Sequence, residues 1–460
     1  MRVTLLTNFL PPTQIGGTEV LSLNLAKSLQ SEGIDIEVIC ADNWDSAPSH
    51  KIEEHCEVYE GVRVRRLHFN WRKAPDVFGS LYNNPVVAAY LRSYFGANRP
   101  DILHVLSCYS LSASPINVAA DLGIPVVLTA TDFWFLCARN TLLKSDGSLC
   151  NGPTSTWKCA SCMLSDSGIF RVGQRILPES MLAPLFEPMG RIPLLARQRG
   201  LRGKHGDWAD RFEFLASALR RTTTIVTASR LLERMYVESG VPQERITYSP
   251  YGIDASWSKE HGNKTPSAEL RIGYIGQIDR HKGVDLLIRA LSTLPRDAPI
   301  RLKIYGNLNR SPAFAAELQE LASDDDRIAF CGTFPQHEIG HVLDGIDVLA
   351  VPSIWYDFPL VIYSAHACHT PVLATDLPGM NEMVSHDVDG LLFPRGDWGE
   401  LARQLVRLLS EPALLPRLVD GISPVKSVDA MTDEYVALYT AVVTGSPPDV
   451  SSVQPKLTAH

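Results

Sequence analysis

The sequence predicts an α/β protein made of two doubly wound domains, each with a parallel sheet covered by helices. Short apolar runs alternate with amphipathic helical stretches along most of the chain, which is the order typical of β–α–β units. The alternation restarts after Ser249–Asp254, a stretch with Pro and Gly that is typical of a linker. With 460 residues, 45% of them hydrophobic, the chain has enough apolar material for two cores.

The first domain is expected over residues 1–248. Val3–Thr7 predicts a buried strand, Pro11–Gly17 a loop, and a helix follows from Thr18 with Leu residues at helical spacing on one face. Further strands are predicted at Ile34–Cys40, Ile102–Leu106, Val126–Thr129 and Thr224–Ala228. A loop-rich, cysteine-containing insertion is expected over about 137–205.

The second domain is expected over residues 249–428 and repeats the pattern. Leu270–Ile275 predicts a strand, Gly276–Gly283 a loop and Val284–Leu294 a helix, and later strands are predicted at Leu302–Tyr305, Ile346–Val351 and Pro371–Thr375. We expect a helix over 429–443 that returns to the first domain, and a disordered tail rich in Ser and Pro over 444–460. Two such Rossmann-like domains are expected to face each other across a cleft, with ligands bound at the carboxyl ends of the strands.

Composition excludes several classes of protein. A net charge of −8 and a pI near 5.9 argue against a general nucleic-acid binder, which needs a positive field. Nine cysteines without dense spacing indicate a reducing compartment. Because no run of about 18 apolar residues occurs and the first ten residues are too polar for a signal peptide, a cytoplasmic protein is expected.

Paired glycines precede the first predicted helix. The backbone amides of Gly16 and Gly17 at a helix start would approach an anion closely, although paired glycines before a helix more often form an ordinary tight turn. The three-glycine spacing of a dinucleotide fingerprint is missing.

Two loops of the second domain have the composition of a phosphate site. Gly276–Gly283 places Lys282 beside a glycine at a strand-to-helix turn, where it would neutralise a diphosphate or, alternatively, lie in a solvated basic loop. Pro352–Ser364 ends a strand and starts a helix, so the amides of Phe358, Leu360 and Val361 would form a second anion site. The loop that ends at Glu382 is expected to face the same cleft.

These segments together resemble the retaining glycosyltransferases of family four, which have the GT-B fold. The residues that carry the resemblance are Gly16–Glu19, Val226–Asp254, Gly276–Gly283 and Pro352–Phe393, so it covers most of the chain. The resemblance implies metal-independent transfer of a hexosyl or deoxyhexosyl group from a nucleotide-diphosphate donor. The second domain would hold the nucleotide and the first domain the acceptor, a glycan or lipid-linked sugar of surface polysaccharide or glycolipid synthesis.

The resemblance also implies residue roles. Catalytic roles would fall to Lys282, Asp357, Thr131 and Asp132, and donor contacts to Gly16, Gly17, Gln277, Arg280, Lys282, Phe358, Leu360, Val361, Ser364 and Glu382.

The chain departs from the family pattern at three of these positions. Gln277 stands where the family has an arginine, with Arg280 as a candidate to replace the charge. Ser364 stands where the family has the second of two glutamates, and the position of the first glutamate corresponds to Tyr356 or Asp357. Thr131, next to Asp132, stands where the family frequently has a histidine.

Four cysteines gather in the insertion. Cys159 and Cys162 form a Cys-x-x-Cys pair, with Cys137 and Cys150 upstream. Four thiolates at this spacing are consistent with a structural zinc ion, and free thiols or a labile disulfide are the alternatives.

Two stretches are basic and interleaved with apolar residues. Residues 170–204 carry seven Arg or Lys against two Glu, and Val62–Lys73 adds five cations with Phe69 and Trp71. This composition is consistent with peripheral contact with an anionic membrane at the inner face, and equally with a solvated face over a core.

Two other functions remain compatible with the sequence. A nucleotide-sugar-binding protein that has lost catalysis would account for Gln277, Ser364 and Thr131. A nucleotide-sugar epimerase of similar architecture would need acid and base side chains that no motif of the sequence supplies.

Overall fold

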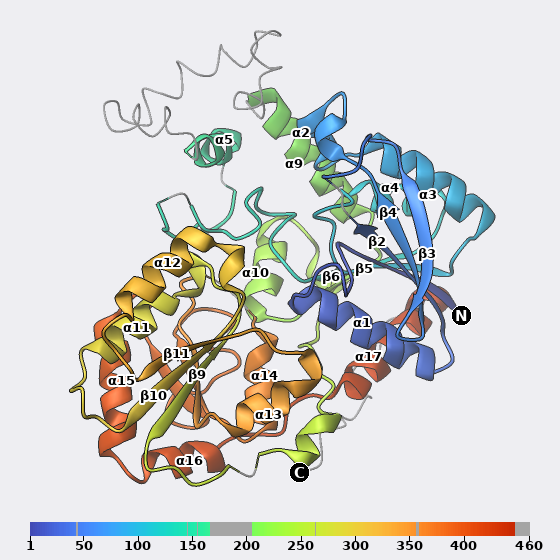
Figure 1. The fold of residues 1–460 in the computed structure, drawn as a ribbon. Coiled ribbons are helices and arrows are strands. Elements are labelled where there is room, and N and C mark those ends of the chain that lie inside the picture. The colour runs from blue at the N-terminus through green and yellow to red at the C-terminus, as the bar shows by residue number, and fades with distance from the viewer. Residues whose placement is uncertain are drawn as a thin grey trace. The chain divides into compact units, whose positions relative to one another are not determined.

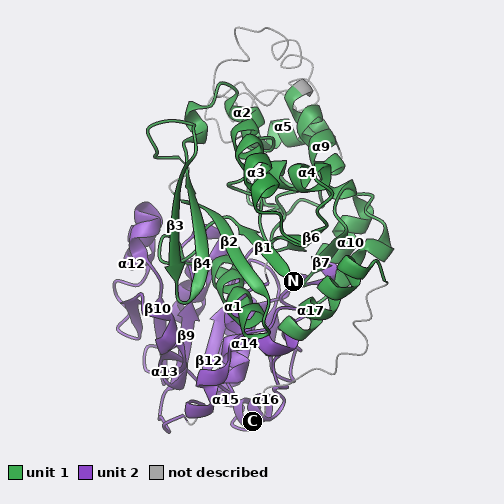
Figure 2. Cartoon of the chain, turned by 90° about the vertical axis from the view of Figure 1, so that its right-hand side faces the viewer, with its two compact units in different colours: residues 1–228, 232–249, 432–453 green, residues 229–231, 250–431, 454–460 purple. Residues whose placement is uncertain are grey.

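The computed structural model describes residues 1–42, 45–144, 146–153, 155–165, 205–262, 264–355 and 358–446. These divide into two compact units (Figure 2). Unit 1 comprises residues 1–228, 232–249 and the described residues from 432 on, and unit 2 comprises 229–231 and 250–431. Each unit contains its own parallel sheet with helices against it (Figure 1), so the predicted α/β fold class with two such domains is confirmed.

The sheet of unit 1 has eight strands in the order β3-β4-β2-β1-β5-β6-β7-β8, parallel except for the β3–β4 pair. The strands are β1 Arg2–Thr7, β2 Asp35–Asp42, β3 Glu53–Tyr59, β4 Val62–His68, β5 Ile102–Val105, β6 Val126–Ala130, β7 Thr224–Thr227 and β8 Ile246–Tyr248. Val3, Leu5 and Leu6 of β1 are fully buried, because a central parallel strand is covered on both faces.

The helices of unit 1 follow its strands in the β–α alternation. They are α1 Gly17–Ser31, α2 Val77–Ser80, α3 Pro85–Ala97, α4 Ser114–Asp121, α5 Thr156–Leu164, α9 His205–Arg220 and α10 Arg230–Glu238, whose first two residues are counted with unit 2. The last helix, α17 Val428–Thr444, packs Tyr435 and Tyr439 against His104 of β5 and so completes the core of unit 1.

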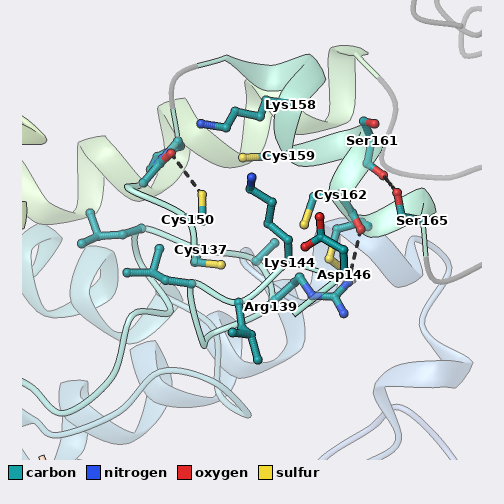
Figure 3. Close-up of a pocket in the computed structure, with 17 residues that line it drawn as sticks. Cys137, Arg139, Lys144, Asp146, Cys150, Lys158, Cys159, Ser161, Cys162 and Ser165 are labelled. Carbon is teal, nitrogen blue, oxygen red and sulfur yellow. Dashed lines mark hydrogen bonds between the residues drawn. The ribbon is translucent and has the colours of Figure 1, made fainter. Parts of the chain in front are cut away.

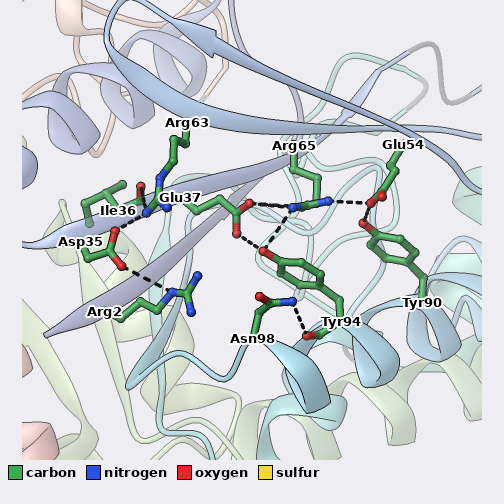
Figure 4. A network of polar contacts seen from close by, with 10 residues as sticks. All are labelled: Arg2, Asp35, Ile36, Glu37, Glu54, Arg63, Arg65, Tyr90, Tyr94 and Asn98. Atoms are coloured by element: carbon green, nitrogen blue, oxygen red, sulfur yellow. Dashed lines mark hydrogen bonds and ion pairs between the residues drawn. The ribbon is translucent and has the colours of Figure 1, made fainter.

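The stretch Val62–Lys73, considered above as a basic membrane-contacting surface, is largely strand β4 with paired cations. Arg65 bridges Glu37 and Glu54 and lies over the ring of Tyr94 (Figure 4). Its neighbour Arg66 is 3% exposed; it forms an ion pair with Glu57 and donates to the Leu10 and Pro11 carbonyls.

Two more arginines of this stretch are paired: Arg63 with Asp35 and Arg72 with Asp45. The ring of Phe69 is buried, whereas Lys73 is exposed and donates to the Pro48 carbonyl. Four of the five cations of Val62–Lys73 are therefore paired with carboxylates, which reduces the positive charge available to an anionic surface. The other basic stretch, residues 170–204, lies outside the described residues.

The sheet of unit 2 has six parallel strands in the order β11-β10-β9-β12-β13-β14. They are β9 Leu270–Ile275, β10 Ile300–Tyr305, β11 Ile328–Gly332, β12 Val348–Val351, β13 Val372–Thr375 and β14 Gly390–Phe393. The helices are α11 Val284–Ser292, α12 Pro312–Leu321, α13 Ile339–Asp344, α14 Leu360–Ala367, α15 Trp398–Ser410 and α16 Leu414–Asp420. Ile272, Ile288 and Leu405 belong to the core that α11 and α15 form against the sheet.

No helix in the described part of the chain is long and apolar enough to cross a membrane.

Candidate functional site

The candidate donor site of unit 2 lies where its strand order reverses. The chain runs from β9 outward through β10 and β11, and then returns to β12 on the other side of β9. In doubly wound sheets, ligands bind outside the carboxyl ends of the two strands at such a reversal. The loops after β9 and β12 are Gly276–Gly283 and 352–359, the two segments that the sequence analysis singled out.

Backbone contacts hold these two loops together. The Ile354 N–H donates to the His281 carbonyl at 2.9 Å, and Ser353 Oγ donates to the same oxygen at 3.2 Å. The rings of His281 and Trp355 meet edge to face with centroids 4.9 Å apart. The loops therefore form one surface.

Gly283 is required by this close approach. Its φ of +70° is in the left-handed region, and a Cβ there would lie 2.0 Å from the Pro352 carbonyl oxygen. Only glycine avoids both the backbone strain and the clash. Gly283 also begins α11 as its N-cap, so the loop ends at a helix N-terminus.

Lys282 and Arg280 lie in the same turn and have different surroundings. Lys282 is half-buried, with Nζ 4.6 Å from the centroid of the Trp355 ring. Arg280 is exposed, forms two hydrogen bonds of 2.7 and 2.8 Å with Glu317 of α12, and lies over the ring of Phe314. The expectation that Arg280 replaces the missing family arginine therefore finds no support in its contacts, since its charge is already paired.

Other predicted donor contacts have local partners. The Gln277 carbonyl accepts a hydrogen bond from Tyr274 Oη at 2.6 Å. Ser364 is 8% exposed, and its hydroxyl donates to the Leu360 carbonyl one turn earlier in α14. Glu382 accepts hydrogen bonds from the Arg230 and Leu231 amides, and so caps the start of α10.

The start of α14 has the predicted form of a helix N-terminus after a strand. Leu360 and Val361 form its first turn, with Pro359 as the N-cap. The ring of Phe358 packs edge to face against Tyr251 and Tyr363. Asp357, to which the resemblance assigns a catalytic role, lies outside the described residues, as does Tyr356.

The strand order of unit 1 also reverses, between β1 and β5, and at such reversals this fold class binds ligands in a crevice. Asp132, after β6, accepts hydrogen bonds from Ser107 Oγ at 3.1 Å and from the Trp134 N–H at 2.9 Å. Burial raises the pKa of Asp132, and these hydrogen bonds only partly oppose it. Thr131 donates to the Leu106 carbonyl at 2.6 Å, which places both predicted residues at the carboxyl end of the sheet.

A further carboxyl group at this crevice was not given a role by the sequence analysis. Glu19, in the first turn of α1, is 6% exposed, and its Oε2 would lie 2.5 Å from a Cβ on Gly16, the N-cap of the helix. Burial raises the pKa of Glu19, and the charge of Asp132 adds to this effect. The signal in the sequence was the Gly-Gly-Thr-Glu run, in which only the two glycines were assigned a role in the site.

The four cysteines of the insertion line one cavity of unit 1 (Figure 3). Within the described ranges, no three His, Cys, Asp or Glu side chains lie close enough together to hold a metal ion as they stand.

Comparison with known proteins places the chain in a family. The family model "Glycosyl transferases group 1" matches residues 269–411, and the model "Glycosyl transferase 4-like domain" matches residues 16–157. A D-inositol 3-phosphate glycosyltransferase of Frankia alni is 34% identical over 429 residues, which are 88% of this chain and 89% of the relative. A protein of the same description from Nocardia farcinica is 29% identical over 49% of this chain, and the match spans about half of the relative's length, 54%.

Solved structures share the fold at low sequence identity. Sucrose-phosphate synthase from Thermosynechococcus elongatus aligns with a TM-score of 0.64 and 18% identity, over 97% of this chain and all of that one. Anabaena Alr3699/HepE in complex with UDP and glucose aligns with a TM-score of 0.59 and 14% identity, over 98% and 99% of the two chains. The chain therefore belongs to the family-four glycosyltransferases of the GT-B fold, which transfer sugars from nucleotide-sugar donors.

Proposed function

We propose that this protein is a retaining, metal-independent hexosyl- or deoxyhexosyltransferase that acts in the cytoplasm. Its donor is a nucleotide-diphosphate sugar, and its acceptor is a glycan or lipid-linked sugar of surface polysaccharide or glycolipid synthesis. The proposal rests on family membership and on the surroundings of Lys282 in unit 2. Retention of the anomeric configuration is what the resemblance to family four implies.

The observation that carries the proposal is the position of Lys282, in the loop after β9 and against Trp355 of the loop after β12. A departing nucleoside diphosphate develops negative charge, and a nearby ammonium group together with helix N-terminal amides stabilises that charge. Lys282 lies beside Gly283, the N-cap of α11, and over Trp355. The indole Nε1 of Trp355 is buried without a hydrogen-bond partner among the described residues, so it is a donor available to a ligand.

Asp132 and Glu19 support acceptor binding by unit 1. Carboxyl groups near the carboxyl end of a sheet are suited to accept hydrogen bonds from sugar hydroxyls. The burial of both groups raises their pKa values, which is a property frequent in functional sites. The curated relatives named above are described as acting on D-inositol 3-phosphate, so this polyol phosphate belongs in the acceptor panel.

The test is transfer from a panel of nucleotide sugars, measured as nucleoside diphosphate release with and without acceptors. UDP-glucose is the first donor to try, because solved neighbours of the same fold were crystallised with UDP and glucose or with UDP-glucose. Lys282→Ala is expected to lower turnover by about 2 kcal/mol or more of transition-state stabilisation, roughly 30-fold. Lys303→Ala, which removes an exposed lysine of β10, is the matched control and should retain activity.

Three outcomes would contradict the proposal. Unchanged turnover in Lys282→Ala would mean that this loop does not hold the diphosphate. Tight donor binding without release or transfer across the panel would indicate a binding protein. A product that remains linked to its nucleotide with an altered sugar would indicate an epimerase.

Stereochemistry and metal dependence need separate measurements. Proton NMR of the initial product should show the same anomer as the donor. Turnover should not fall when Mg²⁺ is omitted from the assay, and inversion or a strict Mg²⁺ requirement would contradict these parts of the proposal.

Peripheral contact with an anionic membrane is the last part of the proposal, and it rests on the basic composition of residues 170–204. The full chain is expected to float with anionic liposomes at low salt and less at moderate salt. Absence of binding at both salt concentrations would contradict it.

A further inference from the structure

The cavity lined by Cys137, Cys150, Cys159 and Cys162 is not used by the proposed reaction. Its volume is about 260 Å³, and Figure 3 shows the four sulfur atoms around it. None of the four cysteines forms a disulfide, and all four are partly buried. Four such thiols are a donor set that suits Zn²⁺ better than the harder metal ions.

Two short local structures bring the thiols together. Cys159 and Cys162 are three residues apart on α5, so they lie on one face of that helix, whose N-cap Ser155 accepts from the Lys158 N–H. The segments on either side of residue 145 pair with each other, because Leu143 bridges to Leu149 and the Cys150 N–H donates to the Leu142 carbonyl at 2.7 Å. This pairing carries Cys150 back towards Cys137.

Arg211 of α9 is a buried cation beside the cluster. It is 4% exposed, and its Nη2 donates to the Trp134 carbonyl at 2.7 Å in the turn that leads to Cys137. Its guanidinium lies 5.6 Å from the centroid of the Trp134 ring, and its Nη1 has no hydrogen-bond partner among the described residues. Burial lowers the pKa of Arg211 to about 10, and negative charge on Cys137 and Cys159 would oppose that shift.

An unpaired buried guanidinium is costly unless an anion compensates it. A zinc ion held by four thiolates has a net negative charge and would supply that compensation. Arg139, Lys144 and Lys158 line the same cavity together with one carboxylate, Asp146, so the lining has more positive than negative side chains.

We propose that Cys137, Cys150, Cys159 and Cys162 form a structural zinc site, with Arg211 as its charge-compensating neighbour. Coordination at a Zn–S distance of about 2.3 Å requires the thiols to move inward into the cavity. The ion would tie Cys150 and the chain before it to α5. The inference is independent of the proposed transferase activity.

The test is elemental analysis of the full chain, purified without chelators and freed of loosely bound metal by gel filtration. We expect about one zinc ion per chain. The double variant Cys159→Ser/Cys162→Ser should lose the zinc. The matched control Cys56→Ser/Cys331→Ser, which removes two exposed thiols from strands β3 and β11, should keep it.

Metal-free wild-type protein would overturn the proposal, as would full zinc content in Cys159→Ser/Cys162→Ser. Intact-mass measurement of the unreduced wild type detects a disulfide through its missing hydrogens. A disulfide among the four cysteines would also overturn the proposal. If the double variant fails to fold, zinc release from the wild type on thiol modification gives the answer. The proposal requires that zinc is released as these four thiols are modified, and not as Cys56 and Cys331 are modified.

Arg211→Gln tests the charge argument separately. Removal of a neighbour that supports a metal site weakens metal affinity by about 10- to 100-fold. Competition of wild type and variant against a chromogenic zinc chelator measures this shift. Unchanged affinity would remove Arg211 from the proposed site.

Discussion

Tyr439 of α17 and His104 of β5 are 335 residues apart in the sequence and share a hydrogen bond in the core of unit 1. The other ring nitrogen of His104 contacts Thr129 Oγ1 at 2.8 Å, and Thr129 in turn contacts Tyr435 Oη at 2.7 Å. All four side chains are buried. This polar chain connects the last helix to the strands of the sheet without any charged group.

Acid pH should weaken unit 1 through His104. Burial lowers the pKa of His104 to about 3, whereas in the unfolded chain it titrates near 6.5. Below pH 6.5 the unfolded state therefore binds a proton that the folded state excludes, and the free energy of unfolding falls by about 1.4 kcal/mol per pH unit from this group. Denaturant unfolding between pH 7 and pH 4 measures the slope.

A neutral replacement should flatten that dependence. His104→Gln retains hydrogen-bonding capacity and cannot take up the proton, so its unfolding free energy should change less with pH than that of the wild type. His337→Gln, at an exposed position, is the control and should keep the wild-type slope. Equal slopes in all three proteins would show that His104 does not titrate in this way.

Gly283→Ala should damage the candidate donor site more than an equivalent change elsewhere. Gly332 has a similar positive φ, 72°, but a Cβ on it would meet nothing within 4 Å. Both substitutions carry a backbone cost of about 1–2 kcal/mol, and only the alanine at 283 also meets the Pro352 carbonyl. Donor affinity, measured by calorimetry, and the melting temperature should therefore both fall further in Gly283→Ala than in Gly332→Ala. Equal losses in the two variants would contradict this geometry.

Arg280→Ala separates the two cations of the loop. Because Arg280 is exposed and paired with Glu317, its removal should change the unfolding free energy by less than about 1 kcal/mol. Transfer activity should stay near that of the wild type, in contrast to Lys282→Ala. A loss of activity as large as that of Lys282→Ala would mean that Arg280 turns to the donor when it binds.

Glu19→Gln should stabilise unit 1 at neutral pH while it impairs transfer. Burial raises the folded-state pKa of Glu19, so its stabilising contribution is present at acid pH and is lost as pH rises through that pKa. The amide has no charge to bury, so the gain in melting temperature should be largest at neutral pH and small below pH 4.5. Glu32→Gln, at the exposed end of α1, should change neither property.

Several strands could be predicted from the sequence because they are buried and therefore consist of continuous runs of apolar residues. Leu270–Ile275 was predicted with the bounds of β9, and Val3–Thr7 differs from β1 by one residue. Strands β3 and β4 were missed, because charged residues alternate through both and hide their pairing. Only the fold shows that Arg65 and Arg66 of β4 meet the carboxylates of Glu37, Glu54 and Glu57.

The sequence by itself determined the alternation of strands and helices, the two-unit organisation and the glycine loops that follow β1 and β9, since these depend on local spacing and backbone freedom. Only the tertiary structure decided that Arg280, and not its neighbour Lys282, pairs with Glu317 of α12. It also decided that Glu19 and Asp132 lie near each other and that Arg211 lies buried beside the cysteines. Side-chain partners depend on segments far apart in the chain, and spacing along the sequence does not record which of them meet.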